Sequence, residues 1–420
     1  MAREMKDSGI AWIGKTPDNW GIIKFKYLHN GLNTGEGIDK EFWSSNENDL
    51  LFYTAGLEPI RTNYRDFPDW KYTNINDLLL ARNGTPYVYL PKEGSCYTDH
   101  IIRASIKSQI NRRFVQYCLQ QSISSVVVDS VSLATWSASL WNTQIIPWPS
   151  ELEQSRIVAF LDAECDRVDA VIEQTRASIE EYKKLKQSVI TEAVTKGIRK
   201  NRPMKDSGIE WIGGIPAEWE CKRTKFIANS ITKGNGITKE DVADDGDIQC
   251  VRYGEIYSKY EGAITTTVSA THENIISAPK YLNSGDILFA GTGELIEEIG
   301  KNVVYIGTEP CLAGGDIIVL NHFQNPIFLN YALNSQYSQM QKSRNKTKLK
   351  VVHISAGDIG NVIIALPPID EQEEIGDYLD KKCDEINIII SSKESLIKEL
   401  ETYKKSLIFE YVTGKKEVTC

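Results

Sequence analysis

Five basic residues near the end of the second half of the chain recur at every second position. They are Lys342, Arg344, Lys346, Lys348 and Lys350. On a strand this spacing places all five charges on one face, whereas a helix would scatter them. Such a one-sided basic strip favours contact with a nucleic-acid phosphate backbone. The alternative is a solvated, lysine-rich edge that discourages pairing with other strands.

Two glycine turns, each following a short run of buried-strand type, carry side chains that can recognise bases. Arg can pair with guanine and Asn with adenine in the major groove. The side chains differ between the two turns, as readers of two different sequences require. Turn chemistry alone is an equal alternative, because Asn-Gly and Thr-Gly favour tight turns. The candidate residues are Arg82, Asn83, Thr85 and Tyr87 in the first turn, and Thr292 and Glu294 in the second.

Two short loops of the form Gly-x-Gly invite a phosphate-loop interpretation. They lack the glycine spacing of nucleotide-binding motifs, which excludes that interpretation. A loop tip that contacts DNA is a weaker hypothesis, and a purely structural turn is the alternative. The tip residues are Thr34 and Glu36 in the first loop, and Lys233 and Asn235 in the second.

Enzymatic motifs are faint in this sequence. Residues 325–328 read Asn-Pro-Ile-Phe, which resembles the Asn-Pro-Pro-Phe of amino-methyltransferases without its second proline. No glycine-rich cofactor motif accompanies it, and the 5 histidines are scattered. We therefore expect no active site and no metal site in this chain.

The elements that must position these residues are organised around two long amphipathic helices. Apolar residues recur at three- and four-residue steps over residues 151–196 and again over residues 370–413. The apolar seam is narrow and the other faces are charged, which predicts packing against another helix of the same kind. A helix of this length spans roughly 69 Å. The two helices together could therefore act as a spacer between two domains.

The chain is internally duplicated. Residues 5–20 (MKDSGIAWIGKTPDNW) match residues 204–219 (MKDSGIEWIGGIPAEW) at an offset of 199. A repeating unit of about 200 residues indicates two whole domains in tandem, whereas the repeating units of solenoids are about 20 to 50 residues long. Short strands, such as those predicted over residues 22–27 and 101–106, alternate with helical patches within each copy, so the predicted fold class is α+β. The predicted domains are residues 1–150 and 201–368, and the predicted spacer helices lie within residues 151–200 and 369–416.

Composition bounds the class of protein. The chain has 420 residues, of which 41% are hydrophobic and 25% charged, as in ordinary globular proteins. Its net charge of −9 weighs against strong DNA binding by the chain alone, but leaves room for a local basic face or basic partners. The 8 cysteines form no Cys-x-x-Cys pair, and no apolar run is long enough to span a membrane. We expect a cytoplasmic protein that does not associate with a membrane.

The duplicated motifs resemble those of the specificity subunits of type I restriction–modification enzymes. One is Ser-Gly-Ile-x-Trp-Ile-Gly-x-x-Pro-x-x-Trp, which occurs at residues 8–20 and 207–219. Another is the proline and Glu-Gln segment with a following Leu-Asp pair, at residues 149–162 and 367–380. The resemblance covers essentially the whole chain, including its two-fold internal order.

The resemblance implies a fold of two tandem α/β target-recognition domains separated by two long helices that form an antiparallel coiled coil. It implies that each domain reads half of a bipartite double-stranded DNA target and that the helices set the spacer. It implies partners: two methyltransferase subunits, and restriction (translocase) subunits. S-adenosylmethionine, ATP and magnesium would bind to those partners. Two alternatives remain open: a coiled-coil scaffold that never contacts DNA, and a self-contained DNA methyltransferase.

Overall fold

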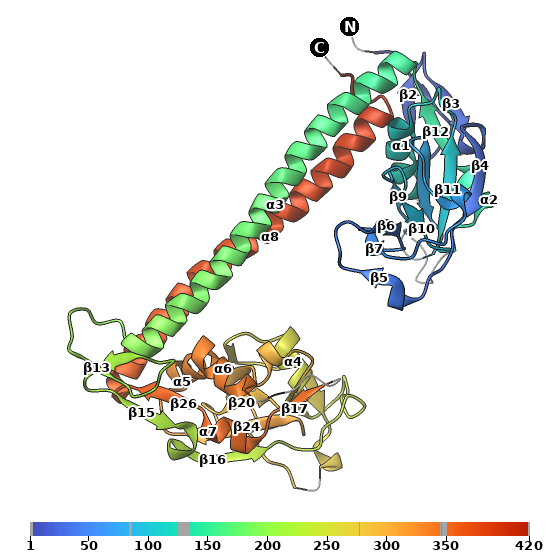
Figure 1. Cartoon of the computed structure of the whole chain (residues 1–420). Helices are drawn as coiled ribbons and strands as arrows, with labels where there is room; N and C mark the ends of the chain where they lie inside the picture. Colours follow the sequence, from blue (N-terminus) through green and yellow to red (C-terminus); the bar gives the residue numbers. More distant parts are fainter. Residues whose placement is uncertain are drawn as a thin grey trace. The chain divides into compact units, whose positions relative to one another are not determined.

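The computed structural model describes residues 3–83, 86–124, 135–276, 278–344, 346 and 351–418. The chain divides into two compact units (Figure 1). Unit 1 is Met1–Thr175 with Glu394–Cys420, and unit 2 is Arg176–Lys393. Each unit contains one α/β body and part of each long helix. The predicted domains, which treat each long helix as a segment of its own, differ from these units and stay a prediction.

The two long helices are α3 (Glu151–Lys196) and α8 (Ile369–Val412). The first has the predicted bounds, and the second begins and ends one residue earlier than predicted. Gly197 and Gly414 follow the helix ends with φ of +74° and +73°. Glycine adopts this left-handed conformation without a Cβ penalty, so it ends a helix readily.

Within each unit the two helices pack side by side and run antiparallel (Figure 1). In unit 1, Lys404 Nζ lies 2.7 Å from Asp169 Oδ1, and the rings of Phe160 and Tyr411 lie 4.4 Å apart. In unit 2, Lys186 Nζ donates to Asn387 Oδ1 at 2.8 Å. The predicted pairing of the two helices is confirmed. None of the described helices is both long and apolar enough to cross a membrane.

The body of unit 1 is built on a sheet with the strand order β4-β11-β8-β9, beside a second sheet ordered β10-β6-β7-β5. Strand β12 pairs with β3, and β1 pairs with β2. The strands are β1 (Met5–Asp7), β2 (Lys15–Pro17), β3 (Gly21–Lys24), β4 (His29–Thr34), β5 (Trp43–Ser44), β6 (Leu50–Tyr53), β7 (Ile60–Thr62), β8 (Asp77–Ala81), β9 (Val88–Tyr89), β10 (Cys96–Tyr97), β11 (Ile101–Ile106) and β12 (Ile145–Trp148). The helices are α1 (Arg112–Ser124) and α2 (Ala138–Thr143).

The body of unit 2 repeats this plan with the sheet order β16-β24-β20-β22-β18 and a smaller sheet ordered β19-β17-β23. Three further pairs are β13 with β14, β15 with β26 and β21 with β25. The strands are β13 (Met204–Asp206), β14 (Gly214–Pro216), β15 (Glu220–Arg223), β16 (Ala228–Lys233), β17 (Ile248–Val251), β18 (Ala263–Ile264), β19 (Ser269–Thr271), β20 (Ile287–Ala290), β21 (Thr292–Gly293), β22 (Asn302–Tyr305), β23 (Cys311–Ala313), β24 (Ile317–His322), β25 (Val352–His353) and β26 (Ile363–Leu366). The helices are α4 (Tyr253–Ser258), α5 (Pro326–Asn334), α6 (Gln336–Ser343) and α7 (Ala356–Asn361).

A duplicated contact joins each body to its long helix. Tyr117 on α1 donates from its hydroxyl to Asp162 Oδ1 at 2.7 Å, and Tyr331 on α5 donates to Asp380 Oδ1 at 2.9 Å. Both carboxylates belong to the repeated Leu-Asp pairs. The repeated motif therefore marks the place where a body packs on its helix.

A second duplicated contact involves the tryptophan that ends each repeated opening motif. Trp219 is fully buried, and its indole N–H donates to Glu371 Oε2 at 2.9 Å. Arg202 pairs with the same carboxylate, its Nη2 lying 3.0 Å from Glu371 Oε2. Unit 1 repeats this Trp–Glu–Arg triad with Trp20, Glu153 and Arg3.

One strand of unit 1 differs from its prediction. The strand expected over residues 22–27 ends at Lys24, and a 3-10 turn, Phe25–Tyr27, follows it. Phe25 is completely buried, and its N–H donates to the carbonyl of Gln144 at 2.8 Å. Tertiary packing of this ring therefore overrides the β propensity of its neighbours.

Candidate nucleic-acid interface

In both units, a central buried strand ends at the same edge of the sheet. Strand β8 ends at Ala81 in unit 1, and β20 ends at Ala290 in unit 2. At this edge the neighbouring strands pair Ile102 with Thr34 in unit 1 and Ile318 with Lys233 in unit 2. Thr34 and Lys233 therefore occupy equivalent positions.

Backbone hydrogen bonds beyond the strand ends are also duplicated. In unit 1, the N–H of Arg82 donates to the carbonyl of His100 at 2.8 Å, and the N–H of Trp136 donates to the carbonyl of Arg82 at 2.7 Å. Unit 2 has the same two bonds, at 2.7 Å from Gly291 to Asp316 and at 2.9 Å from Ile354 to Gly291. The two units therefore share one backbone frame at this edge.

The shared frame aligns five positions whose side chains differ between the units, which we name the strand-end positions. Large parts of the surrounding sheet keep their apolar character in both units, while polarity and charge change here. A constant backbone with changed side chains suits two surfaces that bind different ligands. The five pairs are Thr34 and Lys233, Arg82 and Gly291, Asn83 and Thr292, His100 and Asp316, and Thr135 and His353.

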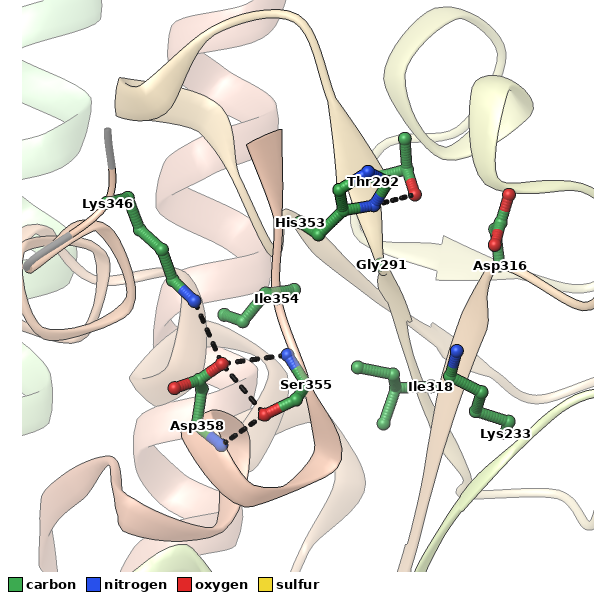
Figure 2. Close-up of a pocket in the computed structure, with 10 residues that line it drawn as sticks. All are labelled: Lys233, Gly291, Thr292, Asp316, Ile318, Lys346, His353, Ile354, Ser355 and Asp358. Carbon is green, nitrogen blue, oxygen red and sulfur yellow. Dashed lines mark hydrogen bonds and ion pairs between the residues drawn. The ribbon is translucent and has the colours of Figure 1, made fainter. Parts of the chain in front are cut away.

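In unit 2 the strand-end positions surround a cleft of about 320 Å³, which we name the strand-end cleft (Figure 2). This volume is at the lower end for a small-molecule site, and its charged lining is unlike the mostly apolar walls of such sites. A polar edge of a larger ligand fits it better. The lining residues are Lys233, Gly291, Thr292, Asp316, Ile318, Lys346, His353, Ile354, Ser355 and Asp358.

Hydrogen bonds fix one wall of the strand-end cleft. Lys346 Nζ donates to Asp358 Oδ2 at 2.9 Å, and the N–H and hydroxyl of Ser355 donate to the same oxygen, each at 2.8 Å (Figure 2). Burial acts to raise the pKa of Asp358, but the bonds from Lys346 and Ser355 hold that pKa below its ordinary value. Asp358 is therefore ionised at neutral pH and compensates the charge of Lys346.

In unit 1 the corresponding surface is made by an amide and an imidazole. Asn83 Nδ2 lies 2.7 Å from His100 Nδ1. Tyr87, the other aromatic candidate here, packs its ring 4.8 Å from that of Tyr89 and so belongs partly to the core. Thr85 lies outside the described residues.

The two Gly-x-Gly loops are structural turns in both units. A Cβ at Gly35 would lie 2.2 Å from the carbonyl oxygen of Tyr97, and one at Gly234 would lie 2.4 Å from that of Gly314. Asn235 is only 6% exposed and donates to the carbonyl of Lys280 at 3.1 Å. Its predicted place at an exposed tip is therefore wrong, because its amide is used to close the loop.

Comparison with known proteins bears on this surface. Residues 216–401 match the model of the type I restriction modification DNA specificity domain family. The type I restriction enzyme MjaVIII specificity subunit of Methanocaldococcus jannaschii is 25% identical over 360 residues, which cover 81% of this chain and 79% of that protein. The putative MjaX specificity subunit of the same organism is 30% identical over 216 residues, covering 49% of this chain and 50% of that protein.

A solved structure has a similar fold. A chain from a study of complex assembly and conformational transition of the type I R-M system covers 96% of this chain and 99% of its own length, with a TM-score of 0.69 and 16% identity. At that identity it establishes a shared fold. Residues 216–401 belong to the type I restriction modification DNA specificity domain family, and most of the chain is similar to a type I specificity subunit. The resemblance noted from its motifs is confirmed.

The predicted basic strip begins on a helix and not on a strand. Lys342 lies on α6 and is 1% exposed, with Nζ donating to the carbonyls of Gly300 at 2.6 Å and Leu333 at 2.9 Å. Its prediction as a phosphate contact is therefore wrong, since its stem fills the core and its ammonium holds two turns together. Arg344 is exposed and Lys346 lines the cleft, so their contact with DNA stays a prediction. Lys348 and Lys350 lie outside the described residues.

The remaining candidates differ in accessibility. Thr34, Lys233 and Glu294 are exposed, Arg82 and Asn83 are half-buried, and Thr292 lies at the cleft wall. Glu36 is half-buried, 4.0 Å from Lys71 Nζ. Sequence reasoning missed His100, Asp316 and His353, because only long-range strand pairing brings them to the strand ends.

The buried side chain of Lys342 should make the stability of unit 2 depend on pH. Burial lowers the pKa of Lys342 from 10.5 to about 7. Between these values the unfolded chain binds more protons than the folded chain, so the free energy of unfolding should rise with pH by up to about 1.4 kcal/mol per unit. Below this window both states are protonated, and burial of the charge destabilises the fold fully.

The test is urea unfolding of the wild type and of Lys342→Met at several pH values between about 7 and 10.5. Hydrogen exchange over unit 2 reports how much of that unit is unfolded. Methionine has a similar volume and does not titrate, so the rise should be missing from the variant. Equal pH dependence in the two proteins would contradict the prediction.

Proposed function

We propose that this specificity subunit selects the DNA sequence on which a type I restriction–modification complex acts. Each unit would contact one half of a bipartite double-stranded target through its strand-end positions. The observation that carries the proposal is the single backbone frame that occurs twice with different side chains. A protein that binds two unlike half-sites needs this combination of a repeated frame and changed side chains.

The long helices would set the distance between the half-sites. An α-helix rises 1.5 Å per residue, so its length is a fixed property of the sequence. Helices α3 and α8 are 46 and 44 residues long, and they pair antiparallel within each unit. Paired helices resist bending and twisting better than a flexible linker does.

The partners would bring the chemistry. The duplicated packing of body on helix, which the Tyr–Asp and Trp–Glu–Arg contacts maintain in both units, would present two equivalent surfaces to the same kind of subunit. We expect two methyltransferase subunits that bind S-adenosylmethionine, and restriction subunits that use ATP and magnesium. This chain would position them on DNA and carry out no chemistry itself.

One other function is favoured by a specific observation. The net charge of −9 suits a scaffold that joins proteins and leaves DNA alone. Basic groups at the strand ends, such as Lys233 and Arg82, favour the DNA proposal. The two proposals differ in whether the chain determines a methylated sequence.

The test is expression of the chain with its methyltransferase partner, followed by modified-base sequencing of the host DNA. We expect a bipartite methylated motif that disappears when this chain is omitted. A stable complex that leaves no motif would favour the scaffold. Methylation by this chain alone, with only S-adenosylmethionine added, would favour a self-contained methyltransferase.

A further inference from the structure

Each unit places an exposed imidazole against the same strand-end position, but takes it from a different segment. In unit 1, Asn83 bonds to His100, which precedes β11. In unit 2, Thr292 Oγ1 lies 3.1 Å from Nδ1 of His353 on β25 (Figure 2). The counterparts of these histidines are not histidines: Asp316 corresponds to His100, and Thr135 corresponds to His353.

The bond to the strand-end residue determines what each imidazole can offer. When the Thr292 hydroxyl donates to Nδ1 of His353, the imidazole proton lies on Nε2, which is then a donor. The side chain of His353 is exposed, so this donor can meet a ligand outside the protein. The hydrogen bond restricts rotation of the ring and so orients the donor.

The strand-end cleft contains two lysines in different electrostatic states. Lys346 is compensated by Asp358, as described above. Lys233 is exposed at the end of β16, and within the described ranges it forms no ion pair. Its ammonium and His353 therefore both present donors at the cleft, and Figure 2 shows them extending from different strands toward it.

Lys233 and His353 offer donors at the cleft, and the exposed carboxylate of Asp316 adds one acceptor, which suits the N4 amino group of the cytosine paired with a guanine. In the major groove guanine presents two acceptors, N7 and O6, and Lys is a common partner of that edge. Unit 1 has Thr34 and Thr135 at the positions of Lys233 and His353, and it presents Arg82 and the amide of Asn83, which suit guanine and adenine. The two units therefore place different groups at equivalent positions of this edge.

We infer that Lys233 and His353 form a base-reading pair that recognises a guanine in the half-site bound by unit 2. The inference rests on the proposed function and identifies its residues and base. The competing outcome is that the same side chains contact phosphates. The two outcomes differ in whether the lost binding energy depends on the DNA sequence. Loss of a base contact relaxes one position of the site, whereas loss of a phosphate contact weakens binding to all sequences.

The experiment uses the full chain purified with its methyltransferase partner and a library of DNA duplexes with randomised half-sites. The test variant carries Lys233→Ala and His353→Ala. Asn83→Ala is a companion variant in unit 1. Lys225→Ala is the matched control, because Lys225 is an exposed lysine of unit 2 that does not line the cleft. All four substitutions are at surface side chains, and thermal unfolding checks that the proteins stay folded.

We expect the double variant to lose about 5- to 150-fold of the discrimination for guanine at one position of one half-site. Asn83→Ala should alter only the other half-site, and Lys225→Ala should alter neither. Uniform weakening with a smaller dependence on salt would replace the inference by a phosphate contact. Unchanged selection, changes in both half-sites, or a wild-type half-site without guanine would overturn it. If the wild-type complex selects no motif at all, the proposed function itself fails.

Discussion

Removing one heptad from each long helix is expected to shorten the DNA spacer and to leave both half-site sequences unchanged. Residues 178–184 of α3 and 389–395 of α8 lie on facing stretches, since Tyr182 and Lys393 are in contact. Seven residues correspond to about 10.5 Å of helix, which is close to three base pairs of DNA. A heptad changes the direction of a helix face by only about 20°, so the apolar seam is restored.

The measurement is modified-base sequencing of cells that express the shortened chain with its methyltransferase partner. A matched control deletes a heptad from α3 alone, which breaks the register of the pair and should abolish methylation. A motif with the original spacing in the doubly shortened protein would refute the role of the helices in setting distance. A motif with altered half-site sequences would place part of the base recognition in the helices.

Replacing Arg202 by Met is expected to destabilise unit 2 by about 3 to 5 kcal/mol, the usual effect of breaking a buried ion pair. The side chain of Glu371 is 1% exposed and that of Arg202 is 9% exposed. Without Arg202, the carboxylate keeps the indole N–H of Trp219 as a partner and loses its compensating charge. The same arginine also pairs with Glu218, but that contact is exposed and contributes little.

Unit 1 supplies the control for this prediction. Arg3 and Glu153 form the equivalent pair with both side chains 22% exposed, so water screens the charge left behind by Arg3→Met. That variant should therefore lose clearly less stability. Hydrogen exchange measured separately over each unit distinguishes the two losses. An equal loss in both units would show that burial of the carboxylate does not determine the effect.

The sequence predicted the elements whose signals are local. Helix α3 has its predicted bounds because prolines precede it and Gly197 follows it, and β11 has its predicted bounds because apolar residues run through it. Strand β3 was predicted too long, since burial of Phe25 is a property of the folded body and not of the segment. Such local signals predict the presence of an element more reliably than the residue at which it ends.

The candidate site was predicted less well, for a related reason. The alternating charges favoured a strand through Lys342. In the structure Ser335 caps the N-terminus of α6, and the aliphatic part of the Lys342 side chain is buried in the core. The turn residues Asn83 and Thr292 were identified because they directly follow apolar runs. Their histidine partners come from segments 17 and 61 residues away along the chain, and no local pattern indicates them.

The composition of unit 1 also bears on how the protein is made. Its core needs Leu407 and Val412 from α8, whereas unit 2 is one continuous stretch, Arg176–Lys393. A ribosome that adds roughly 5 to 20 residues per second would complete unit 2 before the segment that closes unit 1 exists. For tens of seconds the first body would expose the apolar seam at Ile157, Leu161 and Cys165. The first half of the nascent chain is therefore the part that depends most on chaperones, although it is synthesised first.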